Sequence, residues 1–189
     1  PFPNKMKEWV GYKSKTEGMN ISQNNLDVLI DLYGDNSINV YNEIVKLSIQ
    51  YGDSAFDMDI STNSRIKKDS QVWKLVDYVG KKDYRSAINS YNSLYTNNVG
   101  IGTIIFNLFS LFRDMLVSRI DKGQQKGKYV RNKILLKNYN IYSSNYSIEE
   151  NLSAIKFLRD CDFLSKTTSI NQKILLSIAM LQICEAKID

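Results

Sequence analysis

The chain lacks histidine, and it has few prolines, glycines and cysteines for its 189 residues. Without histidine, a Ser–His catalytic pair and a His–Cys zinc site are both excluded. The two prolines lie within the first three residues and glycine occurs only nine times, which disfavours a turn-rich β-sandwich or barrel and favours helices. The two cysteines, Cys161 and Cys184, lie inside apolar helical patterns, which indicates reduced core thiols in a cytosolic protein.

The sequence also lacks a long apolar run. No stretch approaches the roughly 20 apolar residues that span a bilayer, and the N-terminus has no signal-peptide pattern. We therefore expect a cytoplasmic protein with no membrane partner. The formal net charge of +5 permits contact with nucleic acid without requiring it. Because the chain begins at Pro1 and not at methionine, we expect a fragment of a longer protein.

Apolar residues recur at helical spacing along most of the chain, which predicts an all-α protein in two parts. The first part, residues 1–66, is expected to hold three helices: Lys5–Glu17, a second capped by Ser22, and a third that begins near Ser37. The second part, residues 67–189, is expected to be a larger helical bundle. Its helices are expected near residues 72–79, 83–95, 103–120, 132–145, 147–166 and 172–185.

Two helices of the second part are unusually apolar. The helix at 172–185 is apolar almost all round, and helices of this kind belong in the middle of a bundle or at an interface. In the helix at 103–120 only a narrow stripe is polar and is expected to face solvent, and it consists of Thr103, Asn107, Ser110, Asp114 and Ser118.

The segment at 147–166 is a well-marked helix with one anomaly. Ser147 and Glu150 have the spacing of a capping box. The polar stripe of this helix is again narrow (Glu149, Ser153, Lys156 and Asp160), so we expect burial on most other sides. Charged residues nevertheless project from the apolar side of this helix and of the helix at 103–120, namely Arg113, Arg159, Asp162 and Lys166.

Ionised groups on an apolar side need partners. We expect Asp162 to form an ion pair with Arg113, Arg159 or Lys166 and to fix the register of the helix. Asp160 and Asp162 point to different faces of a helix and do not form an acid–base pair. Gly100–Thr103 lacks the glycine and lysine pattern of a phosphate-binding loop. We therefore expect no catalytic residue, no cofactor and no metal, and the chain is not expected to be an enzyme.

A basic stretch with an interleaved tyrosine lies between the helices at 103–120 and 132–145. Such a stretch can contact a nucleic-acid backbone, although most stretches of this kind are solvated loops. A stand-alone helical nucleic-acid-binding module is therefore an alternative function. Its candidate contact residues are Lys122, Lys126, Lys128, Arg131 and Lys133.

Several segments, in order, resemble the C-terminal two-thirds of the delta subunit of bacterial DNA polymerase III, a clamp-loader component, and most closely the Bacteroidetes form. The segments are FPNKMKEWVGYKSKTEGMNIS, INVYNEIVKLSIQYGD, VWKLVDYVGKKDYRSAI, IIFNLFSLFRDML and KNYNIYSSNYSIEENLSAIKFLRDCDFLSK. The chain departs from the family in two respects. The short Ala-x-x-Leu-Gly helix before the Tyr-rich helix is barely supported, and the first, AAA+-type domain is absent.

The resemblance implies a lid domain over 1–66 and a collar domain over 67–189, without a working nucleotide site. It implies contact with other clamp-loader subunits of the gamma/tau and delta-prime types, and with primer–template DNA in the assembled complex. The sliding clamp would be reached only through the missing N-terminal domain. On this reading, the surfaces of the helices at 103–120 and 172–185 are expected to form subunit contacts.

Overall fold

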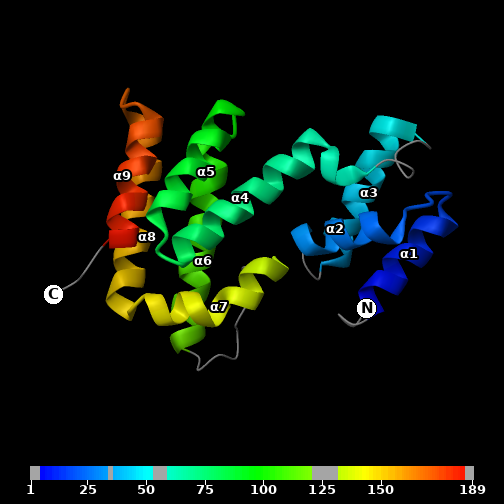
Figure 1. The fold of residues 1–189 in the computed structure, drawn as a ribbon, viewed down its shortest axis with the longest axis horizontal. Coiled ribbons are helices and arrows are strands. Elements are labelled where there is room, and N and C mark those ends of the chain that lie inside the picture. The colour runs from blue at the N-terminus through cyan, green and yellow to red at the C-terminus, as the bar shows by residue number, and fades with distance from the viewer. Residues whose placement is uncertain (1–4, 34–35, 53–58, 121–131, 186–189) are drawn as a thin grey trace. The chain divides into compact units, whose positions relative to one another are not determined.

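The computed structural model describes residues 5–33, 36–52, 59–120 and 132–185, apart from the side chains of residues 64, 133 and 134. Within these ranges all regular secondary structure is helical, which confirms the predicted all-α class (Figure 1). The elements are α1 (Met6–Thr16), α2 (Gln23–Tyr33), α3 (Ser37–Tyr51), the 3-10 turn η3 (Ile60–Thr62), α4 (Ser64–Gly80), α5 (Tyr84–Thr96), α6 (Ile101–Ile120), α7 (Lys133–Asn145), α8 (Ile148–Thr167) and α9 (Gln172–Glu185).

The chain divides into two compact units, and the division falls inside helix α4. Unit 1 contains Pro1–Asp69 and Arg131–Lys133, and unit 2 contains Ser70–Val130 and Ile134–Asp189. The first residues of α4 therefore belong to unit 1 and the remainder to unit 2. A boundary inside a helix needs no linker, which agrees with the absence of a Gly-rich or Pro-rich stretch at this point of the sequence.

Unit 1 is a small bundle in which α1, α2 and α3 pack against one another. Each helix contributes residues at helical spacing to a shared core, and none of these short helices would be stable alone. The buried side chains include Met6, Val10, Leu26, Leu29, Ile44 and Leu47.

Polar contacts join α4 to this bundle within unit 1. Glu43 on α3 is buried and pairs with Arg65 Nη1 at 2.5 Å and Lys46 Nζ at 2.7 Å. The Tyr33 hydroxyl donates to Asp69 Oδ2 at 2.8 Å. A buried carboxylate persists only when cations or donors compensate its desolvation, so Glu43 locates the first turn of α4 against α3.

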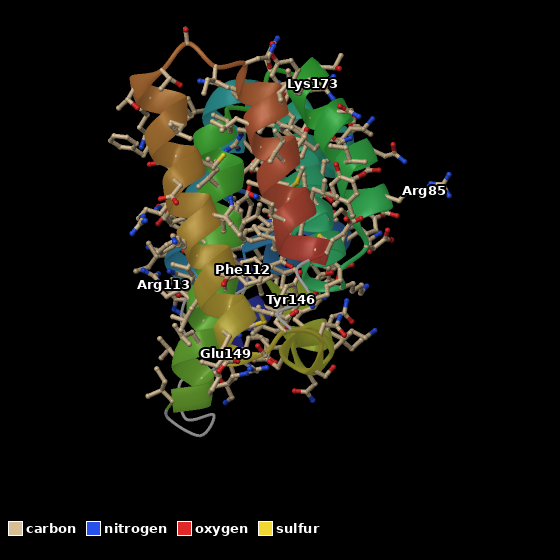
Figure 2. The ribbon with its side chains drawn as sticks, turned by 90° about the vertical axis from the view of Figure 1, so that its left-hand side faces the viewer. Arg85, Phe112, Arg113, Tyr146, Glu149 and Lys173 are labelled. Atoms are coloured by element: carbon tan, nitrogen blue, oxygen red, sulfur yellow. The ribbon has the colours of Figure 1, made fainter. Side chains whose placement is uncertain are left out.

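Unit 2 is built around α6. Helix α6 packs along α8 and also contacts α9, while α9 contacts α5 and α8. Phe112 of α6 is fully buried, and its ring meets Tyr146 edge to face with centroids 5.0 Å apart. This ring contact places the end of α7 against the middle of the core helix (Figure 2).

Tyrosine side chains attach α7 to the last turn of α4. The Tyr146 hydroxyl donates to the Val79 carbonyl at 2.6 Å, and the Tyr142 hydroxyl donates to Asp77 Oδ1 at 2.5 Å. Asn145 Nδ2 donates to the Gly80 carbonyl at 3.2 Å. The bonds to Val79 and Gly80 satisfy carbonyl groups at the end of α4, and the bond to Asp77 satisfies a carboxylate, so docking onto α4 explains the tyrosines of this segment.

Helix α6 departs from the predicted pattern. The stripe expected to face solvent is largely buried, because Ser110, Asp114 and Ser118 all lie in the interior. The Ser110 hydroxyl donates to the Phe106 carbonyl at 2.8 Å, so its burial leaves no hydroxyl unsatisfied. Another side of α6 faces outward instead and carries Gly102, Phe106, Phe109, Arg113, Leu116 and Ile120.

Helix α8 also differs from its prediction, since it is not buried on most sides. Its buried line is narrow and consists of Asn151, Ala154, Leu158 and Cys161. The exposed line carries Glu149, Leu152, Lys156, Arg159, Phe163 and Lys166. Because α6 and α9 cover only one side of α8, apolar residues beyond that side stay in contact with solvent.

Helix α6 is long and apolar enough to cross a membrane by length and composition, the single such helix among the described residues. Core helices of soluble proteins pass the same test. Half of the apolar stretch of α6 is buried inside unit 2, and Asp114 within this stretch is fully buried. Packing inside unit 2 therefore accounts for the buried half of this apolar segment.

The predicted capping box at the start of α8 is present. Ser147 Oγ accepts the Glu150 N–H at 3.1 Å, and Glu150 Oε2 accepts the Ser147 N–H at 2.7 Å. Replacing Ser147 with alanine is expected to lower the free energy of unfolding by about 1 kcal/mol, because one N–H of the first turn loses its acceptor. Urea unfolding followed by circular dichroism measures this loss. Ser153→Ala, in the middle of α8 where no helix end needs a cap, is the matched control and should cause no loss.

Candidate protein-interaction surface

Two of the charged residues predicted on the apolar side, Arg159 and Lys166, lie on the outer surface of unit 2. Lys166 Nζ is 2.6 Å from Asp162 Oδ2, while Arg159 Nη2 is 2.8 Å from Asp160 Oδ1. The side chains of Arg159 and Lys166 are 68% and 67% exposed. Arg159 and Lys166 therefore do not project into the buried side of α8 as expected, because the buried line of α8 is turned away from them.

The predicted ion pair of Asp162 is present, with Lys166 as its cation among the three candidates. Lys166 is the cation beside Asp162, and Arg159 pairs with the carboxylate next to it in the sequence. The Arg113 guanidinium lies 5.8 Å from the Phe109 ring centroid on α6. Ion pairs this exposed contribute little to stability. That they fix the register of α8 therefore stays a prediction.

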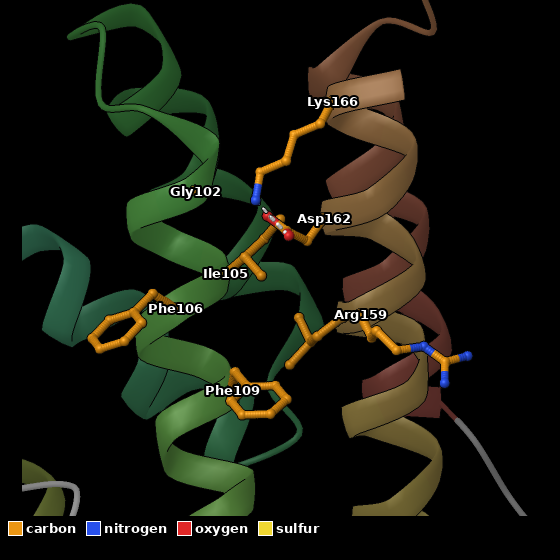
Figure 3. Close-up of a pocket in the computed structure, with 8 residues that line it drawn as sticks. Gly102, Ile105, Phe106, Phe109, Arg159, Asp162 and Lys166 are labelled. Atoms are coloured by element: carbon orange, nitrogen blue, oxygen red, sulfur yellow. Dashed lines mark hydrogen bonds and ion pairs between the residues drawn. The ribbon is translucent and has the colours of Figure 1, made fainter. Parts of the chain in front are cut away.

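An apolar hollow lies between α6 and α8 beside these charges (Figure 3). We call it the α6/α8 groove, and it encloses about 360 Å³. Its walls are Ile105, Phe106, Phe109 and Leu158, and its rim carries Gly102, Arg159, Asp162 and Lys166. Phe106 is 67% exposed and Phe163, one turn along α8 from Arg159, is 63% exposed. Large apolar side chains left in water in this way are typical of a protein contact surface.

A second apolar hollow lies between α5 and α9. We call it the α5/α9 groove, and it is lined by Tyr84, Lys173, Ile174, Ser177, Ile178 and Leu181. Half or more of the surface of Ile174 and of Ile178 is exposed. The two grooves open on different sides of unit 2: in Figure 2, α6 and α8 with Arg113 lie to the left, and α5 with Arg85 lies to the right.

The sequence signalled this surface only in part. The excess of apolar residues in the helices at 103–120 and 172–185 indicated that some must be exposed. It did not single out Phe106, Phe163 or Ile178, because each of these also fits the apolar pattern of a core helix. A helical pattern shows which residues share a face and not whether another helix covers that face.

The described residues contain no group of three or more metal-ligating side chains of the His, Cys, Asp and Glu types. Asp160 and Asp162 are each occupied by a different cation, so they do not converge on one point. The basic candidates Lys122, Lys126, Lys128 and Arg131 lie outside the described residues, and so does the side chain of Lys133. The nucleic-acid alternative therefore stays a prediction.

The cysteine thiols are buried and weakly acidic. Burial, with the charge of Asp162 as the second cause, raises the pKa of Cys161 to about 11, and burial raises the pKa of Cys184 to about 12. Little of either thiol is then ionised near neutral pH, and the thiolate is the form that reacts. We expect alkylation of the folded protein by iodoacetamide to be far slower than in urea, as measured by mass spectrometry. Equal rates with and without urea would contradict the buried placement.

Comparison with known proteins gives two matches. A family model described as the DNA polymerase III delta subunit, C-terminal domain, matches residues 69–183, more than half of the chain. Among solved structures, the Bacillus subtilis DNA clamp loader delta protein matches with a TM-score of 0.68 and 18% sequence identity. No curated protein sequence matches the chain.

The structural match covers 97% of this chain and 57% of the Bacillus chain, so the present chain spans little more than half the length of that protein. At 18% identity the likeness establishes the fold. The family match extends from the middle of α4 into α9, over the helices that form both grooves. It confirms the resemblance to the delta subunit, while the likeness to the Bacteroidetes form stays a prediction, and the chain belongs to the family of the DNA polymerase III delta subunit, C-terminal domain.

Proposed function

We propose that this chain is a non-catalytic part of a clamp loader and contributes to its assembly. Family membership and the fold of a clamp loader delta protein support this proposal. Unit 1 would act as the lid domain, and unit 2 would act as the collar domain that packs against neighbouring subunits. On this proposal the chain is the C-terminal portion of a delta subunit and works in the cytoplasm, and the sliding clamp is contacted by a preceding domain.

The presence of two apolar grooves on different sides of unit 2 carries the proposal. A subunit inside a closed ring touches two neighbours, and it does so with two different surfaces. The α6/α8 groove and the α5/α9 groove are two such surfaces, each with apolar side chains that would lose contact with water on assembly. The expected partners are subunits of the gamma/tau and delta-prime types, with primer–template DNA in the assembled complex.

The test is reconstitution of the complex from the full-length protein and the remaining clamp-loader subunits of the same genome. Size-exclusion chromatography should show one assembly with the unaltered protein. Phe106→Asp and Ile178→Asp should each weaken assembly about tenfold or more, because each places a charge in an apolar contact. The pair together should abolish assembly.

Ile49→Asp is the matched control for these variants. Ile49 lies on α3 in unit 1 and is 80% exposed, so the same chemical change is made away from both grooves. The control should assemble as the unaltered protein does. Absence of any assembly with the unaltered protein would refute the proposed function.

A further inference from the structure

The outer face of α8 carries three cations, Lys156, Arg159 and Lys166. Between Leu152 and Phe163 the exposed positions hold Lys156 and Arg159, and Lys166 follows one turn later. No carboxylate occupies this exposed line from Leu152 to Lys166. The nearest acids, Asp160 and Asp162, are only partly exposed and each pairs with a cation of the line. Lys156 forms no ion pair with any described residue.

The cations border an apolar surface and not a plain solvated face. Leu152 and Phe163 share the exposed line of α8 with the cations, and Phe106 and Phe109 of α6 line the groove beside it. Figure 3 shows Asp162 and Lys166 of α8 turned toward α6, while the Phe106 ring on α6 and the Arg159 guanidinium on α8 point outward on either side. The line from Leu152 to Lys166 is about 21 Å long at 1.5 Å per residue, which matches a partner helix of about four turns.

This combination defines the chemistry of the partner. A helix that lays apolar side chains into a groove presents them at spacings of three and four residues, and carboxylates beside them would meet Lys156 and Arg159. A second copy of this chain fits less well, since a twofold contact would place the cations of α8 against themselves. A nucleic-acid base also fits less well. Seated among the apolar side chains of Ile105, Phe109 and Leu158, its polar edges would lose their hydrogen bonds to water without replacement.

We infer that the α6/α8 groove binds an acidic amphipathic helix of a neighbouring clamp-loader subunit, with a bulky apolar side chain seated between Phe106, Phe109 and Leu158. This inference rests on the proposed function and specifies one of its two contacts. The surface ion pairs of Arg159 and Lys166 are weak, so both cations are available to exchange their acids for those of the partner.

The test uses the full-length protein and measures its affinity for the remaining clamp-loader subunits at low and high salt. The double variant Lys156→Glu/Arg159→Glu should weaken binding at low salt about tenfold or more and remove most of the salt dependence. Phe106→Ala should weaken binding by a similar factor and leave the salt dependence unchanged. Circular dichroism should show folded protein in each case, because all three side chains are largely exposed.

The matched control is Lys74→Glu/Lys137→Glu, which changes the net charge equally at exposed positions of α4 and α7. The inference fails if this control and the α8 double variant bind equally well. If Ile178→Asp prevents assembly while the α6/α8 variants bind normally, the groove inference fails and the proposed function stands. If the unaltered protein forms no complex, the proposed function itself fails.

Two further outcomes would also overturn the inference. In the first, the α8 double variant no longer binds a fluorescent single-stranded oligo-dT but keeps its affinity for the other subunits. This result would assign the face to nucleic acid. The other is a dimer of the unaltered protein in analytical ultracentrifugation that Phe106→Ala dissociates, which would assign the face to a second copy. A monomer whose oligo-dT binding is unaffected by the variants agrees with the inference.

Discussion

Replacing Asp77 with alanine is expected to lower the free energy of unfolding of unit 2 by about 3 kcal/mol, since a buried hydroxyl loses its acceptor and charged hydrogen bonds are lost. Asp77 Oδ1 accepts from the Tyr142 hydroxyl at 2.5 Å and from Asn138 Nδ2 at 2.8 Å. Asp77 Oδ2 pairs with Lys81 Nζ at 2.8 Å. Tyr142 is fully buried, so water cannot replace the missing carboxylate.

The loss can be measured by urea unfolding in a Trp9→Phe background. The chain has two tryptophans, so Trp73 on α4 then reports unit 2 alone by fluorescence. Lys81→Ala should cost less than about 1 kcal/mol, because the Lys81 side chain is partly exposed. Tyr142→Phe removes one bond together with its donor and should cost about 1 kcal/mol. If Asp77→Ala lowers the free energy of unfolding by no more than Tyr142→Phe does, Asp77 does not hold α7 in place.

Gly80→Ala is expected to destabilise unit 2 by about 2 kcal/mol, the typical cost of overfilling a packed interior. A Cβ at Gly80 would lie 2.7 Å from Cδ1 of the Tyr142 ring and 2.9 Å from two further ring atoms. The ring has little room to move, because it is buried and its hydroxyl is held by Asp77. The same fluorescence measurement detects the loss.

Two variants separate this clash from a general effect of alanine. Gly102→Ala adds a methyl group where no atom lies within 4 Å, so we expect no loss of stability. In a Tyr142→Leu background the flat ring is absent, and the cost of Gly80→Ala should fall. A cost that is the same in both backgrounds would place its origin elsewhere, since residues in contact are expected to show coupling.

Helix ends were predictable from the sequence because local residues set them. Ser147 and Glu150 form the expected capping box, and the Asp83 side chain accepts the Ser86 N–H at the start of α5. Gly18 has a positive φ of 77° just after α1, a conformation that a residue with a Cβ rarely adopts. These features depend on neighbours within four residues, and the sequence displays such neighbours directly.

The candidate interaction surface was less predictable. The polar stripe of α6 was expected to face solvent, yet Asp114 is buried and Phe106 is exposed. Arg159 and Lys166 were expected on the apolar side of α8, yet both are exposed. Helical spacing groups residues onto a face, but contact with other helices decides which face is covered.

The sequence by itself determined the helical class, most helix ends and the family resemblance, because composition, spacing and capping are local properties. Only the tertiary structure decided which apolar residues remain outside. It also showed that Asp77, Gly80 and Tyr142 form one docking point, although 62 or more residues separate Tyr142 from the other two. Burial and contact between distant helices arise only when the chain folds, so no local pattern records them.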